Sequence, residues 1–204
     1  MKFTISKLAI LFMMALVYGP LYAQASYDAE EMTLQENISL PVVPKNASNA
    51  IVRHMERIGK TFSKRGVDVK YTRRGEVVDI IFPCNAFFKA NSVELHDTAF
   101  KTLDAFNALL KLPSLYKILV VVHADNTGSS AYADTLTDDR AAAIDDYFAE
   151  RFPSVKLNVI PYGMGSDEPR ASNNSIAGRH ANRRVEFYIV PEQQTIEMAK
   201  SGKL

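Results

Sequence analysis

Two charged side chains occupy positions from which they could grip a charged ligand. Asp125 follows the apolar segment Ile118–Val122, and Arg140 comes after a Gly- and polar-rich loop. In open α/β sheets, ligands bind outside the carboxyl ends of the strands, and Asp125 is expected there. A carboxylate can take an ammonium, and a guanidinium can take a carboxylate through two parallel hydrogen bonds. The pair therefore predicts a site for a zwitterion.

The expected position of Arg140 on its helix supports this interpretation. The pattern predicts a helix after Thr137, which places Arg140 in the first turn, where the helix dipole disfavours cations. A residue that opposes its local preference indicates another role. The alternative is that Asp125 caps the loop, while Arg140 is a surface residue or pairs with Asp139.

A second charged group, Asn182–Glu186, stands at the head of the last predicted strand. Its arginines, Arg183 among them, either bond loop carbonyls at a charged strand entry or form a second cationic wall for an anionic ligand. The residues alone favour the first interpretation.

Catalytic, metal and cofactor signatures are weak. The four histidines show no metal-ligand spacing, and the single cysteine, Cys84, has no recognisable base partner. A buried small hydrophobe is the usual role of a free cysteine. No phosphate-cradling Gly-rich loop occurs, so we expect a protein that is not an enzyme and holds no metal or cofactor. Lys and Arg total 24 against 23 Asp and Glu, which argues against nucleic-acid binding.

The chain divides into four predicted segments. Residues 1–25 have the layout of a secretory signal peptide, with an apolar run, Leu8–Tyr18, that is shorter than the ~20 residues of a membrane-spanning helix; an N-terminal membrane anchor is the alternative. Residues 26–47 mix acids, Asn and Pro without periodicity and predict a linker or tether. A domain is expected over 48–191 and a tail over 192–204.

Hydrophobic periodicity predicts the elements that must position these residues. Helices are expected over 50–66, 96–111 and from Thr137 to before Pro153, with a short one over 176–181. Strands are expected over 67–71 and 76–82 as a hairpin, and over 117–123, 155–159 and 184–190. The fold class is therefore α/β (an α+β sandwich), with an N-terminal helix and hairpin and helices packed on one small mixed sheet. We expect that sheet to be four-stranded.

Three blocks of the sequence resemble the OmpA-like (outer membrane protein A C-terminal) peptidoglycan-binding domain. The blocks occur in the family's order, and the resemblance covers about residues 50–190. The blocks are Phe87–Leu95, His123–Phe148 and Tyr162–Glu186, the last with Gly178-Arg179 and Asn182-Arg183-Arg184.

The resemblance implies an OmpA-like fold and a role for named residues. Family members grip the diaminopimelate of the cell-wall stem peptide, and the matching Asp and Arg are Asp125 and Arg140. The implied ligand-binding set also includes Asn91, Thr127 and Arg183. The family's Asn after Tyr is Ala133 here, which predicts one fewer contact to the ligand.

The resemblance also implies a location and partners. We expect an exported, periplasmic protein associated with the outer membrane and the cell wall, with peptidoglycan as its partner. An outer-membrane protein docked through residues 26–47 is a second expected partner. The alternative function is a structural subunit of an envelope complex that keeps the fold and has a degraded pocket; the Ala133 departure favours it.

Overall fold

A five-stranded mixed sheet organises the unit Thr33–Leu204. The computed structural model describes residues 31–153 and 158–204. The strand order is β1-β2-β5-β3-β4, with β3 and β4 parallel and all other neighbours antiparallel. The strands are β1 Asp68–Thr72, β2 Val77–Pro83, β3 Tyr116–His123, β4 Val159–Gly163 and β5 Arg184–Pro191. The mixed α+β class is confirmed, and the expected count of four strands is wrong because the β1–β2 hairpin joins the other three strands through β5.

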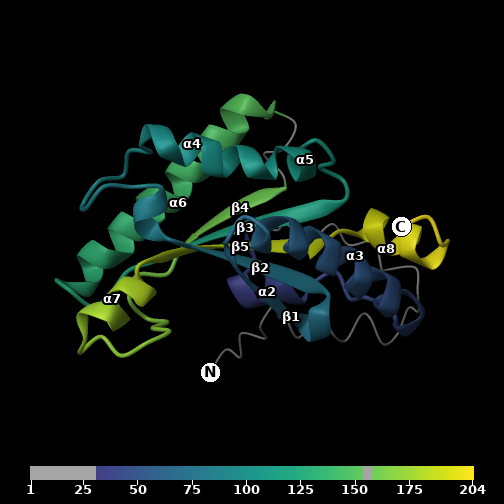
Figure 1. Cartoon of the computed structure of the whole chain (residues 1–204), viewed down its shortest axis with the longest axis horizontal. Coiled ribbons are helices and arrows are strands. Elements are labelled where there is room, and N and C mark those ends of the chain that lie inside the picture. The colour runs from purple at the N-terminus through teal and green to yellow at the C-terminus, as the bar shows by residue number, and fades with distance from the viewer. Residues whose placement is uncertain (1–30, 154–157) are drawn as a thin grey trace, which may run out of the picture. The chain divides into compact units, whose positions relative to one another are not determined.

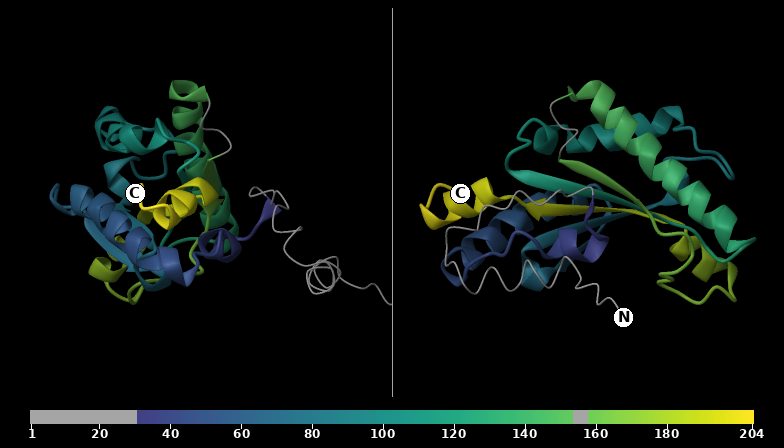
Figure 2. Two further views of the ribbon diagram at one scale, coloured as in Figure 1. Left: turned by 90° about the vertical axis from the view of Figure 1, so that its right-hand side faces the viewer. Right: turned by 180° about the vertical axis from the view of Figure 1, so that it is seen from behind.

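Helices cover both faces of the sheet unequally (Figure 1). One face of the sheet packs against the longer helices. The other face meets the short helix α2, which lies near the beginning of the described chain. The helices are α2 Leu34–Ser39, α3 Lys45–Ser63, α4 Asp97–Leu103, α5 Asn107–Leu110, α6 Ser130–Arg151, α7 Ile176–Asn182 and α8 Gln193–Lys200. Seen from behind, α6 runs along the sheet past β4 (Figure 2). None of the helices in the described residues is long and apolar enough to span a bilayer.

The apolar core lies on the face of the sheet that α3, α4, α6 and α8 cover. Successive strand residues point to opposite faces, so Val185, Phe187 and Ile189 of β5 face this core. Phe106 is fully buried there, and its ring centroid lies 4.4 Å from that of Phe187. β3 is buried along its whole length, as its unbroken apolar run predicts.

The predicted helix over 96–111 is broken into two helices. A 3-10 turn, Asp104–Phe106, separates α4 from α5. Periodicity in an unbroken helix predicts one buried stripe of Phe100, Leu103, Phe106 and Leu110. The last three are buried, whereas Phe100 is 37% exposed and stacks on Tyr147.

Helix α6 begins at Ser130, seven residues before the sequence indicates. Ser129 caps it, with its hydroxyl accepting the backbone N–H of Tyr132 at 3.2 Å. The first turns of α6 are polar and carry no continuous apolar stripe, so periodicity does not indicate where the helix begins. Arg140 therefore lies in the middle of α6, and the argument from the helix dipole does not apply to it.

The described part of the predicted tether is folded. Residues 34–39 form α2, Asn37 and Ile38 are buried, and α3 begins at Lys45. Arg73 donates hydrogen bonds to the carbonyls of Ile38 and Pro41 at 2.9 and 2.7 Å. These contacts to the hairpin turn hold 34–41 against the rest of the unit, and local composition carries no sign of them.

The segment boundaries differ in two further places. The expected tail 192–204 contains α8, in which Ile196 and Ala199 join the core. The strand expected over 155–159 is described only from Val159, and its first part lies outside the described residues. The predicted signal peptide, 1–25, also lies outside them.

The second face of the sheet buries charged side chains. Glu186 accepts a hydrogen bond from Nε of Arg184 at 2.6 Å, and its other oxygen accepts the hydroxyl of Tyr188 at 2.7 Å. Burial would raise the pKa of Glu186, but the contact with Nε2 of His123 at 3.5 Å and the bonds from Arg184 and Tyr188 outweigh burial and lower that pKa to about 2. Burial, with Glu186 nearby, raises the pKa of Asp79 to about 7. Arg170, Lys70 and Arg184 oppose that rise only in part.

The raised pKa of Asp79 predicts that stability falls as pH rises from about 4 to about 7. In that window the folded state holds a proton that the unfolded chain, with an Asp pKa of about 3.9, has lost. Asp79→Asn should remove this pH dependence. Between about pH 5 and about pH 8, the unfolding free energy of the wild type should therefore fall by on the order of 2 kcal/mol more than that of the variant. Denaturant unfolding of both proteins across the window measures it. A constant difference between them would contradict a protonated Asp79.

Candidate functional site

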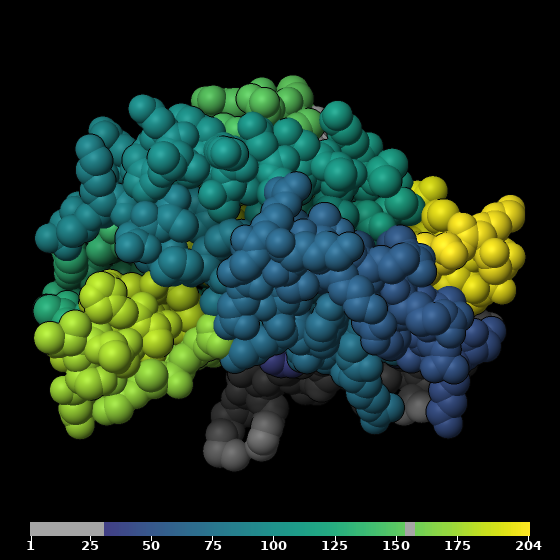
Figure 3. All heavy atoms as spheres, viewed as in Figure 1, coloured from purple at the N-terminus to yellow at the C-terminus, as the bar shows by residue number. Residues whose placement is uncertain are grey.

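A pocket of about 390 Å³ opens where the segment after β2, the loop after β3, α6 and the end of α7 meet. In the space-filling view, the yellow-green region around α7 adjoins the teal region that follows β2 (Figure 3). The five ligand-binding residues expected from the sequence, Asn91, Asp125, Thr127, Arg140 and Arg183, all line this pocket. The structure thus brings together side chains from four separate segments.

Arg140 is buried and is bound to the loop that follows β2. Its Nε donates to the carbonyl of Ser92 at 2.8 Å, and its Nη2 donates to the carbonyl of Lys89 at 3.0 Å. Nη1 lies 3.3 Å from the sulfur of Cys84, and the guanidinium carbon lies 5.0 Å from the ring centroid of Phe88. A guanidinium has five N–H donors, so two remain without a partner among the described residues. The interpretation of Arg140 as a surface residue is wrong.

Asp125 is buried at the carboxyl end of β3 and carries two kinds of partner. Its Oδ1 accepts the backbone N–H of Thr127 at 2.8 Å, and its Oδ2 pairs with Nη1 of Arg183. Burial alone would raise the pKa of Asp125, but the bonds from Thr127 and Arg183 outweigh it and hold the pKa below its usual range. The carboxylate is therefore charged at neutral pH. The capping contact expected in the alternative interpretation is present as well.

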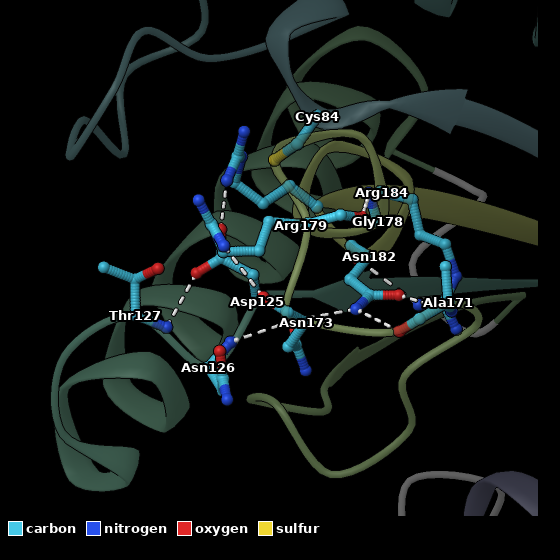
Figure 4. A network of polar contacts seen from close by, with 12 residues as sticks. Cys84, Asp125, Asn126, Thr127, Ala171, Asn173, Gly178, Arg179, Asn182 and Arg184 are labelled. Atoms are coloured by element: carbon cyan, nitrogen blue, oxygen red, sulfur yellow. Dashed lines mark hydrogen bonds and ion pairs between the residues drawn. The ribbon is translucent and has the colours of Figure 1, made fainter.

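Asn182 joins the loop after β4 to the pocket (Figure 4). Its Nδ2 donates to the carbonyl of Ala171 at 2.9 Å and to Oδ1 of Asn173 at 2.8 Å. Oδ1 of Asn173 also accepts the backbone N–H of Asn126 at 3.4 Å. The residue next to Asp125 is thereby tied to α7.

Neighbouring arginines in the last motif have different roles. Arg184 points to the second face of the sheet, where its Nη1 donates to the carbonyls of Glu168 and Asn182 at 3.1 and 3.3 Å. This is the strand-entry role that the sequence favours. Arg183 instead lines the pocket and pairs with Asp125. Arg183 caps the end of α7, whereas Arg184 is the first residue of β5, so the two side chains belong to different elements.

The pocket contains groups that the sequence analysis did not assign to it: Lys89, Tyr132, Cys84 and His180. His180 lies in α7, three residues before Arg183, which caps the C-terminal end of that helix. Burial raises the pKa of the Cys84 thiol, and the positive charges of Arg140 and Arg183 offset that rise only in part. Within the described residues, no three His, Cys, Asp or Glu side chains are grouped as a metal site.

Residues 87–183 match the family model of the OmpA family. The chain is 30% identical over 112 residues to outer membrane protein A of Bordetella avium and 32% identical over 107 residues to the outer-membrane lipoprotein YfiB of Pseudomonas aeruginosa. These matches cover 54% and 52% of this chain, and 57% and 62% of the relatives. A shorter match, 34% over 73 residues, relates 36% of the chain to 22% of the peptidoglycan-binding protein ArfA of Mycobacterium tuberculosis. The chain thus spans about three fifths of the first two relatives' length.

Solved structures share the fold. A MotB-like protein from Desulfovibrio vulgaris superposes with a TM-score of 0.61 at 20% identity, covering 72% of this chain and 99% of that one. The cell wall anchor of the T6SS from Pseudomonas aeruginosa superposes with a TM-score of 0.57 at 23% identity, covering 68% and 97%. Residues 87–183 of this chain thus match the OmpA family, and the two solved structures share its fold.

Proposed function

We propose that this protein is a non-catalytic, periplasmic cell-wall binding module that holds the diaminopimelate of the peptidoglycan stem peptide. The observation that carries the proposal is that one pocket contains both the charged carboxylate of Asp125 and a guanidinium, Arg140, with two N–H donors to spare. The ligand's zwitterionic head has an ammonium for the first and a carboxylate for the second. The relative ArfA, named for peptidoglycan binding, supports the same role.

The remaining pocket residues support the two charged contacts. Thr127 orients the carboxylate of Asp125 through its backbone N–H. Asn91 adopts a positive φ of 54°, which asparagine tolerates better than most residues, and it lines the pocket from within the loop that Arg140 holds. We propose both as ligand contacts, with Arg183 as the third.

Sedimentation with purified diaminopimelate-type peptidoglycan tests this function. The wild type should co-sediment, and Asp125→Ala should be lost from the pellet, because removing one partner of a buried charge pair costs about 2–5 kcal/mol. Arg65→Ala, at an exposed cation outside this pocket, is the matched control and should bind as the wild type does. A folded wild type that stays in the supernatant would favour the structural-subunit alternative.

Ala133, the departure that favours that alternative, is buried in the lining of the pocket. Ala133→Asn should tighten stem-peptide binding by roughly 2- to 10-fold, because a neutral hydrogen bond contributes about 0.5–1.5 kcal/mol. Calorimetric titration measures the change. Ala131→Asn, at an exposed position of α6 that does not line the pocket, should have no effect. Equal affinities for both variants would show that the missing contact is unimportant.

Export and membrane association belong to the same proposal. We propose that residues 1–25 direct the chain to the periplasm and that an outer-membrane protein docks through residues 26–47. The contacts of α2 restrict that docking to the outer side of the segment, where Val42 is 72% exposed.

A further inference from the structure

An incoming ligand meets the guanidinium of Arg183 before the carboxylate of Asp125. The side chain of Asp125 is 7% exposed, whereas that of Arg183 is 37% exposed. Both oxygens of Asp125 have partners, the backbone N–H of Thr127 on one and Nη1 of Arg183 on the other. Arg183 therefore caps the group that the proposed function assigns to the ligand's ammonium.

Displaced from Asp125, Arg183 finds no other acidic partner in the pocket. Asp125 is the one acidic side chain among the described residues of the lining, which also holds Lys89, Arg140 and His180. An ammonium that takes the carboxylate leaves the guanidinium unpaired beside other basic groups. A carboxylate brought in by the ligand removes that penalty.

The side chain of Arg183 can change partner without a backbone rearrangement. Its N–H donates to the carbonyl of Arg179 at 3.1 Å, and its carbonyl accepts the N–H of Cys84 at 2.9 Å. The backbone is thus held between α7 and the end of β2. Rotation of the side chain alone would carry the guanidinium from Asp125 to a ligand carboxylate a short distance away.

We infer, on the basis of the proposed function, that Arg183 determines specificity: it caps Asp125 and yields only to a ligand that carries a carboxylate beside its ammonium. In the bound state the ammonium pairs with Asp125, and the carboxylate on the same carbon is shared by Arg140 and Arg183. The side chain of diaminopimelate ends in such a head. That of lysine ends in an ammonium alone and is excluded.

Calorimetric titration with two stem tripeptides tests the inference. One ends in diaminopimelate, and the other has lysine in its place. The wild type should prefer the first. Arg183→Gln should bind the lysine peptide about 5- to 10-fold more tightly than the wild type, because its ammonium no longer competes with an ion pair. The same variant should bind the diaminopimelate peptide no more tightly, so the preference shrinks.

Two variants separate this effect from changes in charge or folding. Arg65→Gln removes the same charge outside the pocket and should leave both affinities as in the wild type. Arg183→Lys retains a cation that can pair with Asp125 and should keep the lysine peptide excluded. If Arg183 had only a structural role, a lysine at this position would not be expected to restore that exclusion. Circular dichroism reports the fold of each variant.

The outcomes are distinct. Tighter binding of the lysine peptide by Arg183→Gln supports the cap. Unchanged affinities, or an equal loss for both peptides, overturn the cap while leaving the proposed function in place. A folded wild type that binds neither peptide overturns the proposed function and the cap with it.

Discussion

Arg140→Ala is expected to weaken stem-peptide binding by more than about 30-fold, because the ligand's carboxylate then loses the buried guanidinium of Arg140 in a partly dry pocket. The same change should lower the free energy of unfolding by about 1–3 kcal/mol, the cost of leaving a buried acceptor unsatisfied. The acceptors concerned are the carbonyls of Lys89 and Ser92. The fold should survive, because Arg140 belongs to no apolar stripe, and the lost hydrogen bonds account for the lower stability.

Arg140→Lys separates charge from geometry. Lysine keeps the positive charge but lacks the planar fork that reaches two carbonyls and a ligand at once, so binding should still be lost. Titration with the diaminopimelate tripeptide gives the affinity, and denaturant unfolding gives the stability. If Arg140→Lys binds as tightly as the wild type, the site recognises the ligand's carboxylate by charge alone, without the geometry of the guanidinium. If Arg140→Ala binds unchanged, Arg140 serves only to hold the loop.

Phe106→Ala is expected to produce the largest loss of stability, about 3–5 kcal/mol. Phe106 is fully buried, and its ring packs against Phe62, Phe82, Phe148 and Phe187. Removing it leaves a cavity in the middle of the core, between the helices and the sheet. Against a total stability of about 5–15 kcal/mol for a native domain, that loss is large.

Phe100→Ala is the matched control, since it makes the same substitution in the same predicted helix. Phe100 is partly exposed and stacks on Tyr147, with ring centroids 5.3 Å apart. An aromatic pair contributes about 0.5–1.5 kcal/mol beyond its burial, so this variant should lose far less stability than Phe106→Ala. Chemical denaturation of both variants measures the difference. Equal losses would contradict the different burial of the two rings.

The element pattern was predictable wherever burial follows local periodicity. β3 contains the unbroken apolar run Ile118–Val122 and is buried on both faces, as that run predicts, and β5 forms where a last strand was expected. The beginning of α6 was not predictable from periodicity. Its first turns are polar, so its apolar pattern starts late, and the true beginning depends on the Ser129 cap.

Chemistry at the site was predictable from local sequence in part. The motif blocks and the strand end placed Asp125, Arg140 and Arg183 among the candidates, and the structure puts all three in one pocket. Which groups they contact was not predictable. Arg140 bonds to carbonyls 48 and 51 positions earlier in the chain, and the Asp125–Arg183 pair spans 58 positions.

The sequence by itself therefore determined the fold class, most of the elements and the residues that gather at the pocket, because side-chain periodicity and short motifs are properties of neighbouring residues. Only the tertiary structure decided that 34–39 folds onto the sheet, where Nζ of Lys117 donates to Oδ1 of Asn37 at 2.7 Å across 80 positions. It also decided that Arg183 faces Asp125 while Arg184 faces Glu186. Such pairings depend on which segments the folded sheet brings together, and the spacing of residues along the chain does not show which distant segments become neighbours.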